Sequence, residues 1–278
     1  MPVKIVTDST CDLPDEQVSQ GGITVIPLYI NLGDRGYLDG VELSRAEFYR
    51  NLPSYNPPPT TAAKGPEMFR QAYQRLAQEG ADEILSIHIS QKLSATLDVA
   101  RQAALETPGI PVTVLDSQQL SMGTGFLVQA AARLAAQGAR VKDLLPLLLD
   151  QVRRTYTFAA LDTLEFLRRS GRMNPFIANL GNLLQLKPLL LMDGGSPYAR
   201  RVRTRKKAEQ ALVRLLEQHA PLERAAVVHA DARQRAEALF QRVGRLLPPG
   251  ETPLVEITPV IGAHIGPGVV GFVCVRAE

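Results

Sequence analysis

The sequence predicts an α/β protein, with a mainly parallel, helix-covered sheet in an N-terminal domain and a mixed sheet with helices in a C-terminal domain. Short apolar segments alternate with segments of helical periodicity, a pattern that favours a parallel sheet covered by helices. The 278 residues exceed what one hydrophobic core usually organises, and the pattern restarts near Thr155. We therefore expect two domains, at residues 1–155 and 156–278.

In the first half, strands are expected at the short apolar segments, and helices where apolar residues recur every three to four positions. The expected strands cover residues 3–7, 24–32, 83–89 and 112–115. The expected helices cover residues 67–78, 94–105, 123–137 and 141–153, with Gly80 and Gly138 as stop signals. A proline-rich segment at residues 51–59 is typical of an extended connector.

In the second half the same signals predict five strands and four helices. The expected strands cover residues 158–161, 189–192, 225–229, 254–258 and 269–275. The expected helices cover residues 163–169, 175–184, 205–219 and 232–246, and Pro175 suits a first helical turn. A turn is expected at residues 193–197, and the last two strands are expected to run antiparallel on either side of a glycine-rich loop.

The composition excludes several classes of protein. Apolar residues make up 45% of the chain and charged residues 21%, and the net charge of +3 indicates neither a nucleic-acid nor a membrane partner. The first residues lack the apolar segment of a signal peptide, and no apolar run approaches a membrane span, so we expect a cytoplasmic protein without stable membrane insertion. Two cysteines, and four histidines without ligand spacing, predict neither a disulfide framework nor a metal site.

The segment from Thr258 to Gly271 carries the clearest functional signal, because it places His264 between Gly262 and Gly266. Histidine titrates near neutrality, and glycine lets a backbone approach a ligand. The segment therefore fits a loop that holds a small anion or an acyl head group, and a tight turn with an incidental histidine is the alternative. Its G-x-G-x-x-G spacing does not predict a dinucleotide site, because only seven residues follow it.

Small polar residues gather near the ends of expected strands and connectors, where open α/β sheets bind ligands. They are Asp8-Ser9-Thr10, Thr60-Thr61, Ser94 with Thr96, and Asp116-Ser117. Each group alone fits the capping of a helix. Several such groups at strand ends favour a pocket for an anion.

The densest charge of the chain is a basic run, formed by Arg200, Arg201, Arg203, Arg205, Lys206 and Lys207. Cations at a helix N-terminus oppose the helix dipole, so this placement is mildly unfavourable. The run fits either a solvated helix start or a docking surface for an acidic or phosphorylated partner.

Several segments, taken in order, carry a resemblance to a known family. They are VTDSTCDLP at 6–14, IHISQKLS at 87–94, DS at 116–117 with SMGTG at 121–125, LDTLEFLRRSGR at 161–172, VRTRKKA at 202–208, and the His264 segment. In their order and spacing the chain resembles the DegV family of fatty-acid-binding proteins, which includes the FakB subunits of bacterial fatty acid kinase.

The resemblance implies that a long-chain fatty acid is the bound ligand, held between the two domains without a metal or other cofactor. It implies that the hydroxyls of Thr61 and Ser94 hold the carboxylate, and that Arg172 and His264 lie near the head group. An ATP-dependent kinase subunit would then phosphorylate the carboxylate, and the acyl phosphate would feed phospholipid synthesis. Arg172 and His264 are the candidates to place positive charge near the developing phosphoryl oxygens.

One departure from the family pattern concerns Thr61. Where the family usually continues with Ser-Gln-Pro-Ser, this chain has Ala62-Ala63-Lys64-Gly65. The hydrogen bonds expected around Thr61 are therefore fewer.

Physical chemistry supports an acyl ligand independently, since burying about fifteen methylenes gains roughly 12 kcal/mol before the costs of association. Helical segments containing Phe166, Leu167 and residues 176–186 are candidates to line the tail. The alternative is a stand-alone acyl hydrolase or transferase using Ser94 and His264, which turnover of an acyl ester by the purified chain would reveal. The lack of a P-loop or a G-x-S-x-G motif favours a carrier subunit over an independent enzyme.

Overall fold

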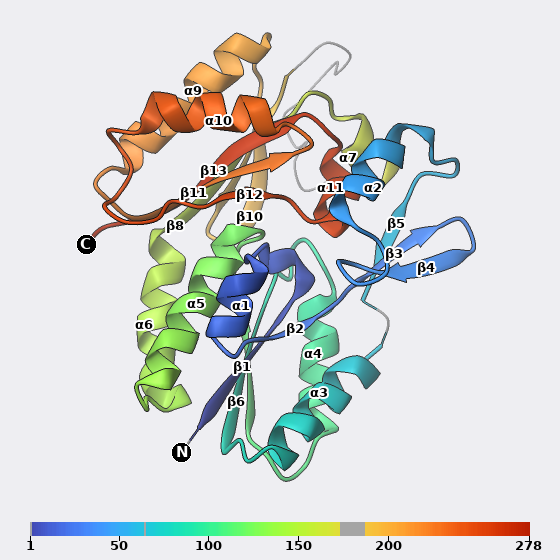
Figure 1. Cartoon of the computed structure of the whole chain (residues 1–278), viewed down its shortest axis with the longest axis vertical. Helices are drawn as coiled ribbons and strands as arrows, with labels where there is room; N and C mark the ends of the chain where they lie inside the picture. The colour runs from blue at the N-terminus through green and yellow to red at the C-terminus, as the bar shows by residue number, and fades with distance from the viewer. Residues whose placement is uncertain (1, 64, 173–186) are drawn as a thin grey trace.

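The computed structural model describes residues 2–63, 65–172 and 187–278, and these residues form three β-sheets with flanking helices (Figure 1). One sheet has four strands in the order β2-β1-β6-β7, one has six in the order β10-β9-β8-β13-β11-β12, and one has three in the order β4-β3-β5. The α/β class expected from the sequence is confirmed.

The four-stranded sheet is wholly parallel, as the alternation of apolar and helical segments predicts. Its strands are β1 (Val3–Asp8), β2 (Thr24–Ile26), β6 (Glu83–His88) and β7 (Val112–Asp116). Val6 and Ile84 pack with α3 (Glu67–Gln78) and α4 (Thr96–Leu105) on one face. Ile5 and Leu85 belong to the core shared with α5 (Met122–Ala136) and α6 (Val141–Arg154), so helices cover both faces (Figure 1).

The single strand expected at residues 24–32 is two strands in two sheets, which corrects the prediction. β2 ends at Ile26, and β3 (Tyr29–Leu32) pairs instead with β4 (Arg35–Leu38) and β5 (Thr60–Ala62). Pro27 lies between the two strands, and proline cannot donate to a sheet ladder. The three-stranded sheet carries Thr61 on β5. Two short helices, α1 (Asp15–Gln20) and α2 (Arg45–Asn51), also lie in this half.

The six-stranded sheet is mixed, as expected for the second half. Its strands are β8 (Thr155–Ala160), β9 (Leu189–Asp193), β10 (Ser196–Arg200), β11 (Leu222–Ala230), β12 (Leu254–Glu256) and β13 (Val269–Arg276). β11 and β12 are parallel and the other neighbours are antiparallel. Helices α9 (Arg205–His219) and α10 (Arg233–Val243) pack on one face through a separate hydrophobic cluster.

The connection between β12 and β13 differs from the expected glycine-rich loop. The two strands run in opposite directions, but they are not neighbours, because β11 lies between them. Residues 259–265 form a helix, α11 (Pro259–Ile265), which Thr258 precedes and Gly266 ends with a φ of 76°. Pro259 at the first helical position explains the helix start, since its fixed φ suits that position.

Helix α7 (Glu165–Arg169) follows β8 and lies against α11 (Figure 1). The helix expected at residues 175–184 falls outside the residues that the structure describes. Within them, no helix combines the length and apolar character needed to cross a membrane.

Candidate functional site

A cavity of about 290 Å³ lies between the carboxyl ends of the parallel strands, the six-stranded sheet, β5 and α11. Its lining is mainly apolar, and the apolar side chains come from every one of these elements. They are Leu28, Ile89, Leu93, Leu120, Leu161, Leu167, Leu190, Leu191, Met192, Val228, Ile257, Val260, Ile261 and Ile265, with Ala62, Ala63, Ala95 and Ala159. Of the residues expected to line an acyl tail, Leu167 lines this cavity and Phe166 does not, because its ring packs against Gly266. Residues 176–186 lie outside the described part of the chain.

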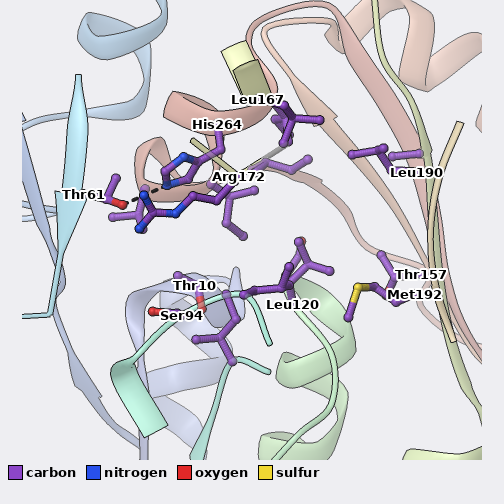
Figure 2. Close-up of a pocket in the computed structure, with 18 of the residues that line it drawn as sticks. Thr10, Thr61, Ser94, Leu120, Thr157, Leu167, Arg172, Leu190, Met192 and His264 are labelled. Atoms are coloured by element: carbon purple, nitrogen blue, oxygen red, sulfur yellow. Dashed lines mark hydrogen bonds between the residues drawn. The ribbon is translucent and has the colours of Figure 1, made fainter. Parts of the chain in front are cut away.

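Most of the polar lining groups lie toward one end of the cavity. Figure 2 shows Thr61, His264 and Arg172 together at one end, with Thr10 and Ser94 facing them across the opening. Leu190, Met192 and Thr157 lie at the other end, and the Thr157 hydroxyl donates to Gln119 Oε1. An elongated ligand with a polar head and an apolar tail fits this division.

Thr61 and His264 form a hydrogen bond at this end, with Thr61 Oγ1 2.8 Å from His264 Nε2 (Figure 2). Burial, and secondly the charge of Arg172, lowers the pKa of His264 to about 4. His264 is therefore neutral near pH 7 in the ligand-free protein, and its expected role in phosphoryl transfer stays a prediction. Its Nδ1 is buried without a hydrogen-bond partner among the described residues.

Ser94 lies in the turn before α4 and lines the cavity. Its Oγ accepts a hydrogen bond from Thr96 N at 3.3 Å and lies 2.8 Å from Thr96 Oγ1. His264 pairs with Thr61 rather than with Ser94, so the nucleophile–base hydrogen bond of the hydrolase alternative is not formed in this structure.

Arg172 follows α7 and brings a full positive charge to the polar end. Its side chain is exposed and lines the cavity, and one guanidinium nitrogen donates to Ser170 O at 3.0 Å. The same charge disfavours protonation of His264. The pair thus combines one permanent cation with one neutral imidazole.

Gly262 and Gly266, expected to approach the ligand, are not among the cavity-lining residues. A side chain at Gly262 would collide with the Tyr49 hydroxyl, and one at Gly266 would collide with the Phe166 ring. The structure therefore gives both glycines a packing role, and their contact with a ligand stays a prediction.

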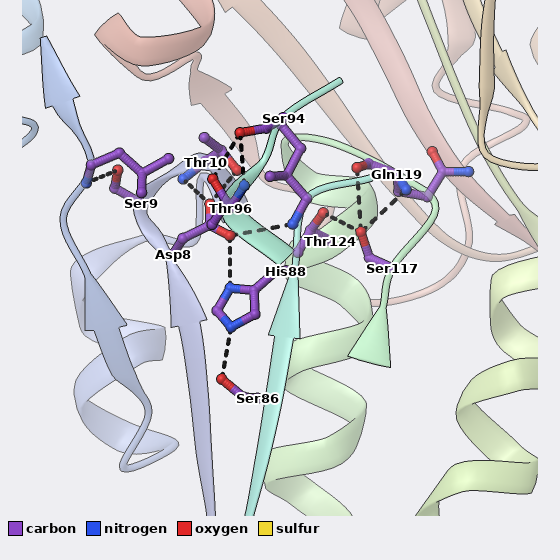
Figure 3. A network of polar contacts seen from close by, with 12 residues as sticks. Asp8, Ser9, Thr10, Ser86, His88, Ser94, Thr96, Ser117, Gln119 and Thr124 are labelled. Atoms are coloured by element: carbon purple, nitrogen blue, oxygen red, sulfur yellow. Dashed lines mark hydrogen bonds and ion pairs between the residues drawn. The ribbon is translucent and has the colours of Figure 1, made fainter. Parts of the chain in front are cut away.

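The other polar groups belong to buried networks behind the cavity wall (Figure 3). Asp8 accepts hydrogen bonds from His88 Nδ1 at 2.9 Å and from the Thr10 backbone at 3.0 Å, and His88 Nε2 lies 2.7 Å from Ser86 Oγ. Burial alone would raise the pKa of Asp8, but its hydrogen bonds and the charge attraction of His88 lower it. Of these four residues Thr10 alone lines the cavity.

The order Ser86–His88–Asp8 resembles a catalytic triad in its hydrogen bonds. Ser86 is fully buried and does not line the cavity, so no substrate carbonyl reaches it. Ser117 is also buried, 2.9 Å from Thr124 Oγ1, and is a structural group rather than a pocket group.

The basic run lies on the surface, from the end of β10 to the first turn of α9. All six of its basic side chains are exposed. Arg205 forms an ion pair with Asp162 at 2.6 Å, and Thr204 caps the helix by accepting from Lys207 N at 3.3 Å. This geometry is compatible with both interpretations of the run.

Two polar lining residues, Ser121 and Thr157, were missed by the sequence analysis. Ser121 precedes α5 with a φ of 52°, and Thr157 Oγ1 donates to Gln119 Oε1 at 2.8 Å. No local signal identifies them, because it is the packing of β8 beside the turn before α5 that places them at the cavity. The described residues contain no group of three metal-binding side chains placed to hold an ion.

Comparison with known proteins extends over the whole chain. Residues 2–277 match the family model for DegV, an uncharacterised protein family. A DegV domain-containing protein of Streptomyces coelicolor is 39% identical over 276 residues, which is 98% of this chain and 97% of that protein. A Thermus thermophilus DegV family structure, described by its fatty acid binding, matches with a TM-score of 0.90 and 36% identity over 100% of both chains. DegV of Bacillus subtilis, described as a fatty acid binding protein, matches with a TM-score of 0.91 and 30% identity, over 99% of this chain and 100% of that one.

Proposed function

This chain belongs to the DegV family, and on that basis we propose that it binds a long-chain fatty acid in the cavity, with the carboxylate at the Thr61–His264 end. Residues 1–155 and 156–278 are the two domains of this proposal, and the ligand lies between them. The named Thermus and Bacillus relatives support the ligand class.

The observation that carries the proposal is the division of one cavity into a mainly polar and a mainly apolar end (Figure 2). A carboxylate removed from water must be hydrogen-bonded or paired. Thr61, Ser94 and Arg172 offer two hydroxyls and a guanidinium, and bonds to an ionised group are the strong ones. The apolar lining from β9 and α11 then accounts for the tail.

We further propose that the bound carboxylate is presented to an ATP-dependent kinase subunit in the cytoplasm. The carboxylate oxygen would attack the γ-phosphorus of ATP, the bond to the β-phosphate oxygen would break, and an acyl phosphate would form for phospholipid synthesis. Arg172 would stabilise negative charge on the transferring group. His264 would hold Thr61, and with it the carboxylate, in place. In this proposal the chain is a carrier subunit rather than a catalyst on its own.

The basic run, from Arg200 to Lys207, is the proposed docking surface for that kinase. Charge removal by Arg203→Gln and Lys206→Gln should slow association and weaken its salt dependence, while saturating kinase restores transfer. Lys142→Gln, an exposed lysine on α6, is the matched control. An association rate equal to that of the unaltered chain would remove the run from the interface.

Mass spectrometry of lipid extracted from the recombinant protein tests the binding proposal directly. A fatty acid should co-purify in nearly stoichiometric amount, and adding it back to delipidated protein should raise the melting temperature. Ligand-free protein from a fatty-acid-replete host, together with an unchanged melting temperature, would overturn the proposal.

A further inference from the structure

Helix α11, which carries His264, is held in place by side chains from the first half of the chain. Thr258, which precedes the helix, donates its backbone N–H to Asp12 Oδ1 at 2.7 Å and its hydroxyl to Asp39 Oδ2 at 2.5 Å. Tyr49 on α2 donates its hydroxyl to Ile257 O at 2.9 Å. A helix of seven residues depends on such tertiary support, because it is too short to be stable alone.

Asp12 also reaches the opposite wall of the cavity. Its second carboxylate oxygen accepts a hydrogen bond at 2.5 Å from Ser121, which lines the cavity before α5. One carboxylate thus joins the start of α11 to the wall that carries Leu120 and Ser121. Asp12 is 1% exposed, so this bridge is shielded from water.

The cluster holds more acidic than basic groups. Asp12 and Asp39 are both buried, and the cation nearest to them is Arg45 on α2, whose guanidinium lies 3.6 Å from Asp12 and also donates to Glu256 O. Asp39 Oδ1 has no hydrogen-bond partner among the described residues. Asp12 and Asp39 thus share one partly exposed cation, so ionisation of both leaves excess negative charge shielded from water, which is costly.

We propose that Asp12 is a proton-controlled clamp on α11: with its carboxyl protonated the helix stays closed against the first half, and with the carboxyl ionised this edge of the site is free to open. The direction follows from linkage. Opening would return Asp12 to water, and loss of a proton favours whichever state solvates the charge better. Because α11 carries His264, the protonation state of Asp12 would control whether the hydrogen bond between Thr61 and His264 is formed.

The groups around Asp12 favour a transition in mild acid. Burial raises the pKa of Asp12 to about 6, against the opposing effects of Arg45 and of the hydrogen bonds from Ser121 and Thr258, while Asp39 raises it further. Tyr49, Cys11 and Asp8 also face this cluster, as does Glu256 on β12. Burial likewise raises the pKa of Asp39 and of Glu256, so both titrate in the same sense as Asp12.

His264 acts in the opposite sense, because burial lowers its pKa and its protonation favours opening of α11. The test therefore compares His264→Gln with His264→Gln/Asp12→Asn, both ligand-free. The measurement is amide hydrogen exchange of residues 260–266, as protection factors at about pH 7.5 and about pH 5. In His264→Gln, protection should rise about tenfold on acidification. Addition of Asp12→Asn should raise protection at pH 7.5 and reduce its rise on acidification to the part that Asp39 and Glu256 contribute.

A purely structural role for Asp12 predicts the reverse, since Asp12→Asn would weaken charge-assisted hydrogen bonds and lower the protection of α11. That result would overturn the clamp, as would equal protection of His264→Gln at the two pH values. The comparison of His264→Gln at the two pH values needs no Asp12 variant. It therefore decides the question even if the double variant does not fold. The control for removing an acidic side chain elsewhere is Asp150→Asn, on α6, in the His264→Gln background. Its protection of residues 260–266 should equal that of His264→Gln at both pH values.

The effect on the ligand rests on the proposed function. In the chain with His264 intact, Asp12→Asn should slow both uptake and release of a fatty acid at pH 7.5, with a smaller change in affinity. Unchanged rates alongside raised α11 protection would show that the ligand enters by another route and would overturn the clamp as a gate. No fatty acid binding by any variant would overturn the proposed function and leave the exchange result standing.

Discussion

Thr61 Oγ1 lies 2.8 Å from His264 Nε2, although 203 positions separate the two residues in the chain. Thr61 stands on β5 in the three-stranded sheet, and His264 stands in the last turn of α11. The polar end of the cavity is therefore assembled from two remote segments, and either segment alone lacks the geometry to hold a carboxylate.

The hydroxyls of Thr61 and Ser94 should each contribute to head-group binding. Thr61→Val and Ser94→Ala each remove one hydrogen bond to an ionised group, and fatty-acid affinity should fall about 10- to 100-fold by calorimetry. Thr60→Ala is the matched control, since Thr60 is an exposed neighbour on β5. The methyl ester should bind the unaltered chain less tightly than the free acid, and equal affinities would show that these hydroxyls do not hold the head group.

Arg172 and His264 should matter more for transfer than for binding. Because Arg172 is exposed, water weakens its ion pair with the carboxylate, so Arg172→Gln should lower fatty-acid affinity by less than about tenfold, as should His264→Gln. Both variants should lose about 100-fold or more in acyl-phosphate formation at saturating kinase. Arg172→Lys should recover part of this loss, because it restores charge without the planar fork. Undiminished transfer by His264→Gln would reduce this histidine to a packing residue of α11.

The pH dependence of stability should contain two opposing contributions. The pKa of His264 is lowered from 6.5 to about 4, so its contribution to stability is lost as the pH falls through that window. The pKa of Asp12 is raised from 3.8 to about 6, so its contribution grows as the pH falls from about 6 toward 3.8. Each contribution amounts to at most about 3 kcal/mol, and in the unaltered chain they largely cancel.

Urea unfolding at about pH 6.5 and about pH 4.5 separates the two contributions. On acidification, Asp12→Asn should lose about 2 kcal/mol more than the unaltered chain, and His264→Gln should lose about 2 kcal/mol less. Other carboxylates titrate alike in all three proteins. An example is Glu165, where hydrogen bonds from Arg168 and Arg169 lower the pKa to about 2. Parallel pH profiles for the three proteins would contradict both assignments.

Gly262 should resist substitution because of Tyr49. Gly262→Ala places a methyl group against the Tyr49 hydroxyl and should destabilise the protein by about 1–3 kcal/mol through overpacking. Tyr49→Phe removes the nearest colliding atom, the hydroxyl oxygen, along with the hydrogen bond to Ile257 O, and leaves two ring carbons at 2.8 and 2.9 Å from the added methyl group. The double variant should therefore be more stable than the sum of the single effects predicts, and additive unfolding free energies would count against this contact.

Local sequence signals account for most of the helices and strands. The bounds predicted for α3 and α9 are those of the structure, because both helices are long, strongly periodic and flanked by clear stop or cap signals. Residues 259–265 form a helix where a loop was expected, because Thr258-Pro259 is a helix-start signal in spite of the neighbouring glycines. The strands β4, β5 and β10 escape prediction, because each is only three to five residues long and depends on pairing with β3 or β9.

The residues of the candidate site likewise divide into those with a signal in the sequence and those that only tertiary contacts place. The resemblance to a known family identifies Thr61, Ser94, Arg172 and His264, and the structure brings all four to one cavity. The buried supports of that cavity, Asp12 and Asp39 among them, carry no local signal. Their role arises from the contact of α11 with the first half of the chain. Hydrogen bonds between residues more than 200 positions apart produce no periodic pattern in the sequence.

The position of β13 has a consequence for synthesis of the protein. β13 follows every other strand of the six-stranded sheet in the chain, yet it lies at the centre, between β8 and β11. Until the ribosome has released residues 269–276, β8 and β11 each present an unpaired edge, and such edges invite association with other chains. Interrupted translation near residue 268 would therefore yield a product with its parallel sheet encoded in full but its second sheet split in two, and chaperone demand should be highest at that point.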